Sequence, residues 1–225
     1  VDDLLDDPEH VLVQHNKRDP QFFDVYRVNV KTGDAQLVAQ NPGNITGWIT
    51  DHAGQVRMAS TSDGVNTSLL YRASEKDAFK TILTTDFRTT VSPLFFTFDN
   101  KSLYALSNRG RDKTALVVLD PVNASESQPL FEHPEVDLDG VSYSHKRKLI
   151  TQAGFTTWKS QRHFFDAETR AIYTRLQEKL PGYEISLQSE NRAEDTFVVA
   201  AYNDRTQGAR YVYSLKTDTL TPLGE

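Results

Sequence analysis

The stretch Gly47-Trp-Ile-Thr-Asp-His-Ala-Gly-Gln-Val-Arg-Met-Ala-Ser60 contains two short apolar runs separated by the turn Asp51–Gly54. Ser68–Arg72 and Phe79–Leu83 follow as two further runs, and polar loop residues bound each of them. Short runs rich in β-branched and aromatic side chains, separated by Gly, Asp, Asn and Ser, are typical of strands joined by hairpins. This part of the sequence therefore predicts four consecutive antiparallel strands.

The same order of runs recurs five times along the chain. The second run of each cycle starts at Val11, Val56, Leu103, Leu149 and Phe197, in steps of 45, 47, 46 and 48 residues. A repeat of about 40–50 residues predicts stacked units that bury their apolar faces against their neighbours. Four antiparallel strands per repeat are typical of a β-propeller blade. A β-sandwich also has many short strands, but its spacing need not repeat in groups of four.

We therefore expect an all-β fold, a single β-propeller domain of four-stranded antiparallel blades. The five blades are expected at about residues 1–40, 41–85, 86–132, 133–178 and 179–225 of the 225-residue chain. Val1–Leu5 is the expected innermost strand of the first blade, and Gln128–Phe131 the outermost strand of the third. Ile172–Leu176 is the expected outermost strand of the fourth blade, although Thr169–Lys179 also fits a helix. The chain starts and stops close to blade boundaries, which indicates a piece of a longer protein.

Composition excludes several classes of function. The net charge of −6, with Lys146-Arg-Lys148 as the densest basic run, argues against a nucleic-acid partner or an anionic membrane surface. The chain contains no cysteine, which excludes disulfides and thiolate chemistry. It also lacks an apolar stretch of the roughly 20 residues that span a bilayer. The compartment is left open between the cytoplasm and a bacterial periplasm.

No catalytic constellation is found in the sequence. The serine elbow G-x-S-x-G is absent, and its nearest approach is Gly140-Val-Ser-Tyr-Ser144. Glu135–Gly140 begins like a calcium loop, but the twelfth position is Lys146 instead of the required Glu. The six histidines lack the spacing of a zinc site. We expect no catalytic residue, no metal and no cofactor in this chain.

One pattern suggests a binding surface. Arg and Asp recur at similar places in the loops expected between the second and third strands of the blades, notably Arg18, Arg111, Asp112 and Arg205. Loops on a rigid scaffold commonly carry binding contacts. These four residues are candidate contacts to a substrate or to a second domain. The alternative is that Asp and Arg pair locally and fix each loop.

Several segments carry a family resemblance: Asp6–Val13, Asp24–Gly33, Asn41–Trp48 with Asp51-His52, Ser107–Asp112 and Ala209–Tyr213. They resemble the propeller domain of prolyl oligopeptidase family serine peptidases, in the dipeptidyl aminopeptidase and acylaminoacyl-peptidase branch. The resemblance implies a propeller joined to an α/β-hydrolase domain that holds a Ser-Asp-His triad. It also implies that peptides react between the two domains. This chain has fewer blades than that family's propellers and lacks the hydrolase half, so no catalytic residue can be transferred.

The resemblance implies a non-catalytic domain that gates and selects peptide substrates for a serine peptidase. Its partners would be the α/β-hydrolase domain of the parent chain and a peptide, and the chain alone would not cleave peptide bonds. We expect the parent gene to continue past Glu225 into a G-x-S-x-G segment. One alternative is a stand-alone propeller scaffold that binds another protein. Another is a glycosidase or lactonase acting from the central channel, which the scarcity of ionisable groups on the expected inner strands disfavours.

Overall fold

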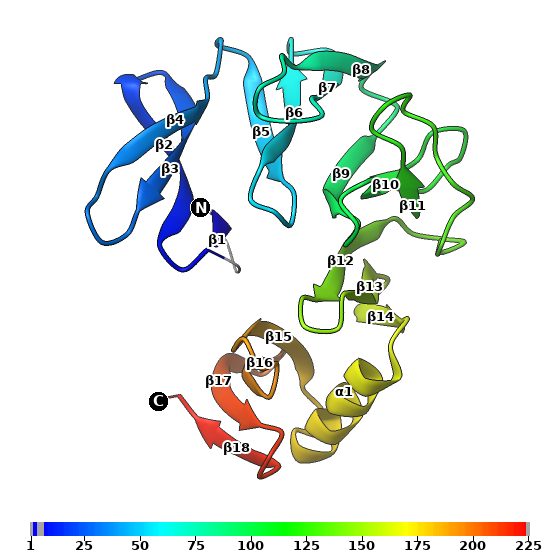
Figure 1. The fold of residues 1–225 in the computed structure, drawn as a ribbon. Coiled ribbons are helices and arrows are strands. Elements are labelled where there is room, and N and C mark those ends of the chain that lie inside the picture. Colours follow the sequence, from blue (N-terminus) through cyan, green and yellow to red (C-terminus); the bar gives the residue numbers. More distant parts are fainter. Residues whose placement is uncertain (1, 4–6, 224–225) are drawn as a thin grey trace. The chain divides into compact units, whose positions relative to one another are not determined.

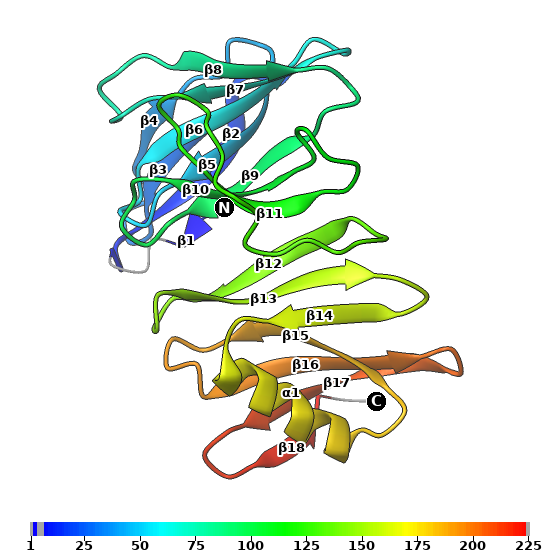
Figure 2. The same ribbon diagram turned by 90° about the vertical axis from the view of Figure 1, so that its right-hand side faces the viewer.

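The computed structural model describes residues 2–3 and 7–223 (Figure 1, Figure 2). Within these residues the strands form five antiparallel sheets, and one α-helix is present. Strands adjacent in each sheet are also adjacent in the sequence, because each hairpin pairs consecutive strands. The chain divides into two compact units, Val1–Leu138 and Asp139–Glu225. The predicted all-β class and antiparallel pairing are confirmed.

The first unit contains three sheets. Their strands are β1 (Asp2–Asp3), β2 (His10–Asp19), β3 (Phe22–Asn29) and β4 (Ala35–Ala39); β5 (Ile45–Thr50), β6 (Val56–Ser62), β7 (Thr67–Tyr71) and β8 (Lys80–Thr85); and β9 (Val91–Phe96), β10 (Leu103–Ser107) and β11 (Ala115–Leu119). Asp2 and Asp3 of the expected first strand pair with β2, whereas Val1, Leu4 and Leu5 lie outside the described residues.

The second unit contains two sheets and the helix. Its elements are β12 (Leu138–Ser144), which starts at the last residue of the first unit, β13 (Leu149–Thr156), β14 (Ser160–Phe164), α1 (Ala167–Lys179), β15 (Glu184–Glu190), β16 (Thr196–Asn203), β17 (Thr206–Ser214) and β18 (Thr219–Pro222). In the part of the chain that the structure describes, no helix has the length and apolar character needed to cross a membrane.

The third sheet lacks the expected fourth strand over Gln128–Phe131. Phe131 of this segment makes an isolated bridge to Leu116 of β11, and Glu126, just before the segment, makes another to Leu119. Pro129 has no N–H to donate, and the Ser127 hydroxyl accepts from the Val118 amide in place of a main-chain carbonyl. The prediction of four regular strands in this repeat was therefore wrong.

The fourth sheet also has three strands, because the expected strand Ile172–Leu176 is part of α1. Asp166 caps the helix by accepting a 2.8 Å hydrogen bond from the Thr169 amide. Buried residues of α1 are Thr169, Ile172, Tyr173 and Leu176, a spacing that follows a 3.6-residue period rather than the alternation of a strand. The strand prediction was wrong here, and the helical alternative was right.

Neighbouring sheets share apolar cores within each unit. Leu12 and Val25 of the first sheet pack with Val56 of the second. Met58 and Leu69 of the second sheet pack with Phe96 and other side chains of the third. In the second unit, Leu176 of α1 joins a core with buried side chains of the fifth sheet. This is the packing expected of repeats that bury their faces against each other.

The repeat is also visible in the backbone of the turns between first and second strands. Gly54, Asn100, Lys148 and Glu194 all have positive φ, at 76°, 57°, 54° and 52°. These positions are separated by 46, 48 and 46 residues. The left-handed conformation favours Gly and Asn, so Lys148 and Glu194 are unusual occupants of this turn position.

Candidate contact surface on the hairpin loops

The sequence-predicted contact residues lie in or beside hairpins that join the second and third strands of a sheet. Arg18 lies near the end of β2, Arg111 and Asp112 lie between β10 and β11, and Arg205 lies between β16 and β17. Arg18, Arg111 and Asp112 belong to the first unit, and Arg205 belongs to the second. We use the term hairpin end for the end of a sheet that carries this turn. The connection to the next sheet leaves from the same end, as the pairing of Thr67 with Thr85 illustrates in the second sheet.

Arg18 is bound to its own sheet by a buried carboxylate. Its Nε donates to Asp24 Oδ2 at 2.7 Å, and its Nη2 donates to Asp24 Oδ1 and to the Asn41 carbonyl, both at 3.0 Å. The fully buried Asp24 also accepts from the Asn41 amide at 2.7 Å. The Arg18 hydrogen bond lowers the pKa of Asp24 and outweighs the opposite effect of burial. Arg18 therefore joins the β2–β3 hairpin to the segment that leads into the second sheet.

The arginines of the third sheet converge on Glu126. The nearly buried Glu126 carboxylate accepts from Ser107 Oγ at 2.8 Å and lies 3.1 Å from Arg109 Nε. Arg111 Nη1 donates to the Ser107 carbonyl at 3.2 Å and lies 3.7 Å from a Glu126 oxygen. These contacts fix the β10–β11 hairpin against the segment that follows β11. Asp112 is exposed at the turn, and its carboxylate lies 3.4 Å from Lys113 Nζ.

Arg205 is exposed at the β16–β17 turn. Its backbone amide donates to Asn203 Oδ1 at 3.0 Å, which holds the turn while the side chain extends into solvent. The structure thus joins Arg18 to Asp24 and Arg111 to Ser107 and Glu126. Asp112 and Arg205 are the predicted residues that present exposed side chains.

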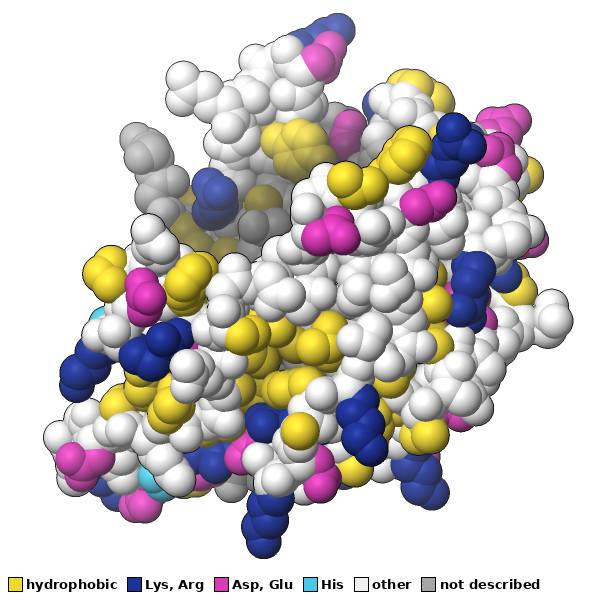
Figure 3. All heavy atoms as spheres, turned by 90° about the horizontal axis from the view of Figure 1, so that it is seen from above, with side chains coloured by type: hydrophobic (Ala, Val, Ile, Leu, Met, Phe, Trp, Pro, Cys, Tyr) yellow, Lys and Arg dark blue, Asp and Glu magenta, His cyan; other side chains and the backbone are white. Residues whose placement is uncertain are grey.

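Exposed apolar side chains near the hairpin ends were not predicted as contacts. Trp158 in the β13–β14 turn is 82% exposed, with Lys159 Nζ 4.7 Å from the centre of its ring. In the first unit, Phe23 at the start of β3 is half exposed, and Phe87 after β8 is 76% exposed. Figure 3 shows one face of the molecule on which hydrophobic side chains are exposed between basic and acidic ones. A single apolar residue in a polar loop forms no periodic pattern. The sequence signal that could have identified these residues is one large apolar side chain surrounded by turn-forming residues.

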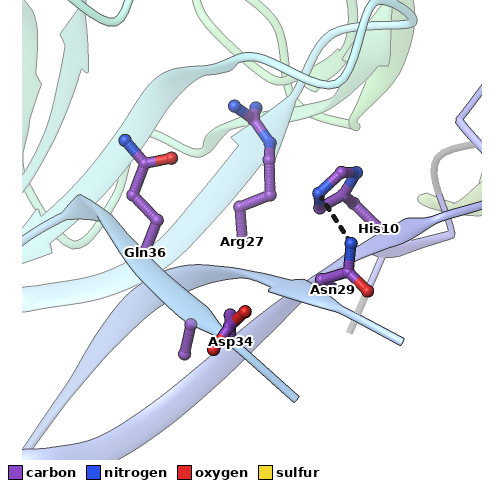
Figure 4. A pocket seen from close by; sticks show the side chains of 6 residues that line it. His10, Arg27, Asn29, Asp34 and Gln36 are labelled. Atoms are coloured by element: carbon purple, nitrogen blue, oxygen red, sulfur yellow. Dashed lines mark hydrogen bonds between the residues drawn. The ribbon is translucent and has the colours of Figure 1, made fainter. Parts of the chain in front are cut away.

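A pocket of about 280 Å³ lies on the first sheet. Its lining includes His10, Arg27, Asn29 and Gln36, which the pairing of β2, β3 and β4 places on one face (Figure 4). Arg27 Nη2 donates to the Gly54 carbonyl at 2.8 Å and lies 3.3 Å from Glu75, and both of these residues lie in turns between strands of the second sheet. The guanidinium at this pocket therefore links two sheets. No group of residues suited to binding a metal ion occurs among residues 7–223.

No family model matches this chain. A curated relative is dipeptidyl aminopeptidase BIII of Pseudoxanthomonas mexicana, which is 28% identical over 220 residues. The match covers 96% of this chain and 31% of that protein. The chain therefore spans about a third of the length of this relative.

Solved structures share the fold at low sequence identity. A prolyl endopeptidase has a TM-score of 0.53 and 14% identity over 95% of this chain and 32% of its own. TolB from Acinetobacter baumannii has a TM-score of 0.55 and 9% identity over 95% of this chain and 52% of its own. Oligogalacturonate lyase from Vibrio parahaemolyticus has a TM-score of 0.54 and 9% identity over 96% of this chain and 62% of its own. Their names describe different activities, so these structures support the β-propeller fold and no particular function.

Proposed function

On the premise that this chain is a propeller segment of the prolyl oligopeptidase family, we propose that it gates and selects peptides for a serine peptidase. The observation that carries the proposal is the sequence similarity to a dipeptidyl aminopeptidase along nearly the whole chain. The relative is about three times longer than the matched segment, which leaves room in that protein for a separate catalytic domain. The fold alone would not distinguish this function from others built on similar sheets.

We also propose that residues 1–225 form one propeller domain of five blades. Each of the five sheets falls within one of the expected ranges, 1–40, 41–85, 86–132, 133–178 and 179–225. The outermost position of a blade is then filled by a strand, an irregular segment or a helix. An experimental structure of the full-length protein would count the blades directly.

In this proposal the α/β-hydrolase domain of the parent chain is the partner, and a peptide is the substrate. The hydrolase domain would supply a serine nucleophile, its base and its oxyanion donors, and catalyse acyl transfer. The propeller would contribute no reacting group and would act by restricting which peptides reach the serine. Arg18 and Arg111 would position the hairpins, whereas Asp112 and Arg205 would be available for contacts.

Three measurements test the proposal. The coding sequence that follows Glu225 should encode a G-x-S-x-G segment, and the purified 225-residue chain should leave dipeptidyl substrates intact. A chimera should then carry this chain in place of the matched third of dipeptidyl aminopeptidase BIII. We expect it to cleave short peptides and to exclude folded proteins that the catalytic portion alone degrades. Peptide hydrolysis by the isolated chain, or equal cleavage of folded proteins by the chimera and the catalytic portion, would contradict the proposal.

A further inference from the structure

The hairpin end of the second sheet presents two strongly exposed apolar side chains. Val65 lies in the β6–β7 turn and is 64% exposed, and Phe87 lies just after β8 and is 76% exposed. Thr67 pairs with Thr85, so both residues are two positions beyond the same cross-strand pair. Val65 and Phe87 therefore extend from the same end of one sheet.

The turn that carries Val65 is held by an aspartate. Asp63 Oδ1 accepts from the amides of Val65 at 2.9 Å and Asn66 at 2.7 Å, and its Oδ2 accepts from Asn66 Nδ2 at 3.0 Å. Donation from the Asn66 backbone, followed by that from its side chain, lowers the pKa of Asp63 to about 2. The carboxylate is therefore ionised at neutral pH and bound to its own turn, which fixes the backbone at Val65.

The connection that carries Phe87 is fixed at both of its ends. Asp86 Oδ1 accepts from the amides of Arg88 at 3.0 Å and Thr89 at 3.1 Å. Asn108 of the third sheet accepts from the Thr90 amide at 2.7 Å and donates through Nδ2 to the Arg88 carbonyl at 3.1 Å. Phe87 is thus an aromatic side chain on a backbone that is already ordered.

Phe87 is an ordered aromatic residue that exposes most of its ring to water. Burial of this exposed apolar surface against a partner would be favourable. Aromatic side chains held on rigid backbones are the typical anchors of protein interfaces, because little conformational entropy is lost when they dock. The geometry of Phe87 is that of an anchor.

The charges beside Phe87 indicate what would cover it. Asp63 and Asp86 direct their Oδ1 atoms to their own backbone amides, whereas the Arg88 guanidinium carbon lies 5.4 Å from the centre of the Phe87 ring. The surface consists of two apolar side chains and a cation stacked on one of them. It complements an apolar surface that carries a carboxylate.

We propose that Val65, Phe87 and Arg88 are the docking contact of this chain for the hydrolase portion of the longer peptidase. The inference rests on the proposed function, and it moves the contact from the arginines at the hairpin ends to an apolar anchor. Arg18 and Arg111 already bind Asp24 and Ser107 in their own sheets. The exposed face of the Phe87 ring is available to a partner without competition from such hydrogen bonds.

Hydroxyl-radical footprinting of the full-length protein and of the 225-residue chain tests the contact without any substitution. We expect oxidation of Phe87 to fall roughly tenfold in the full-length protein, because a central anchor of an interface is desolvated. Val122 is the internal control, since it is 74% exposed in the turn after β11, at the other end of the third sheet from its hairpin. Its oxidation should be the same in both proteins.

Variants separate a docking role from simple shielding. Phe87→Ser should leave the melting temperature of the 225-residue chain unchanged and should restore oxidation of Val65 in the full-length protein. Val122→Ser is the matched control and should change neither the melting temperature nor the oxidation of Val65.

Three outcomes would overturn the inference. If Phe87 is oxidised equally in the 225-residue chain and in a full-length protein that still excludes folded substrates, this inference fails and the proposed function stands. Protection that grows with the concentration of the 225-residue chain alone would assign the surface to a second copy and also overturn it. A parent protein without a hydrolase portion would remove the proposed function and this inference together.

Discussion

Two boundaries between neighbouring sheets, one in each unit, contain the same hydrogen bond at the same repeat position. In each, a backbone amide after the first strand of one sheet donates to a turn side chain of the next sheet, and we call this contact a clasp. In the first unit the His52 amide donates to Asn100 Oδ1 at 2.9 Å, and in the second the Lys146 amide donates to Glu194 Oε1 at 2.9 Å. Each residue of the second clasp follows its counterpart by 94 residues, which is two repeats. Both acceptors have positive φ in the turn between first and second strands.

The two clasps differ in charge and in the core behind them. Asn100 is neutral and also accepts through its carbonyl from Arg57 Nη1 at 2.9 Å. Glu194 is acidic and also accepts from the Ser144 hydroxyl. The core behind the first clasp contains strand side chains such as Phe96, whereas the core behind the second includes α1. The turns and inner strands are thus repeated closely, while the outer layer varies.

The largest expected effect tests whether α1 is essential to the second unit. Leu176 is fully buried in the core shared with the fifth sheet, so Leu176→Ala should lower the free energy of unfolding by about 3 kcal/mol. Urea unfolding measures the loss, and hydrogen exchange should place it in residues 139–225. Glu178→Ala, at an exposed site on the same helix, is the control and should stay within about 0.5 kcal/mol of wild type. An equal loss of protection in β5–β11 would show that the two units do not unfold separately.

The next effect compares the two clasps directly. Glu194→Ala leaves the buried Ser144 hydroxyl and the Lys146 amide without their acceptor, and should cost about 2 kcal/mol. Asn100→Ala removes one side-chain acceptor and should cost about 1 kcal/mol. Glu194→Gly and Asn100→Gly are the controls for the left-handed backbone, because Gly adopts positive φ without strain. Equal losses in the two alanine variants would indicate that the charge of Glu194 and its second hydrogen bond add no stability.

The smallest expected effect concerns acid sensitivity of the helix cap. Burial raises the pKa of Asp166, but hydrogen bonds from Thr169 and Arg147 outweigh it, and the net shift is downward. A pKa lowered on folding stabilises the folded state above the unfolded value of 3.8, and this contribution is lost as pH falls through the folded value. Asp166→Asn should therefore cost about 1 kcal/mol near neutral pH and less at about pH 3.

Urea unfolding at the two pH values measures this difference. Asp204→Asn, an exposed substitution in the same unit, should change stability little at either pH. If Asp166→Asn cost the same at both values, the carboxylate would not be the titrating cap.

The sequence predicted the repeat well, because strand spacing and turn residues are local properties. The repeat predicts a strand at Ile172–Leu176, although Ile172, Tyr173 and Leu176 already follow a helical period. Asp24 and Glu126, the partners of the arginines, depend on how a hairpin packs against later segments and could not be paired from spacing. The exposure of Phe87 and Trp158 could not be predicted from a sequence pattern, because the conformation of the surrounding loop decides whether a single apolar residue is exposed.

Each strand finds its partners among its nearest neighbours in the chain. A sheet of this protein is therefore complete as soon as about 40 consecutive residues are available, and no strand must wait for a distant one. Loop closure between neighbouring strands costs little conformational entropy, so nucleation can occur in any sheet and spread to the next. On the ribosome, the order of synthesis would then become the order of assembly, with the first sheet able to form while the last is still being translated.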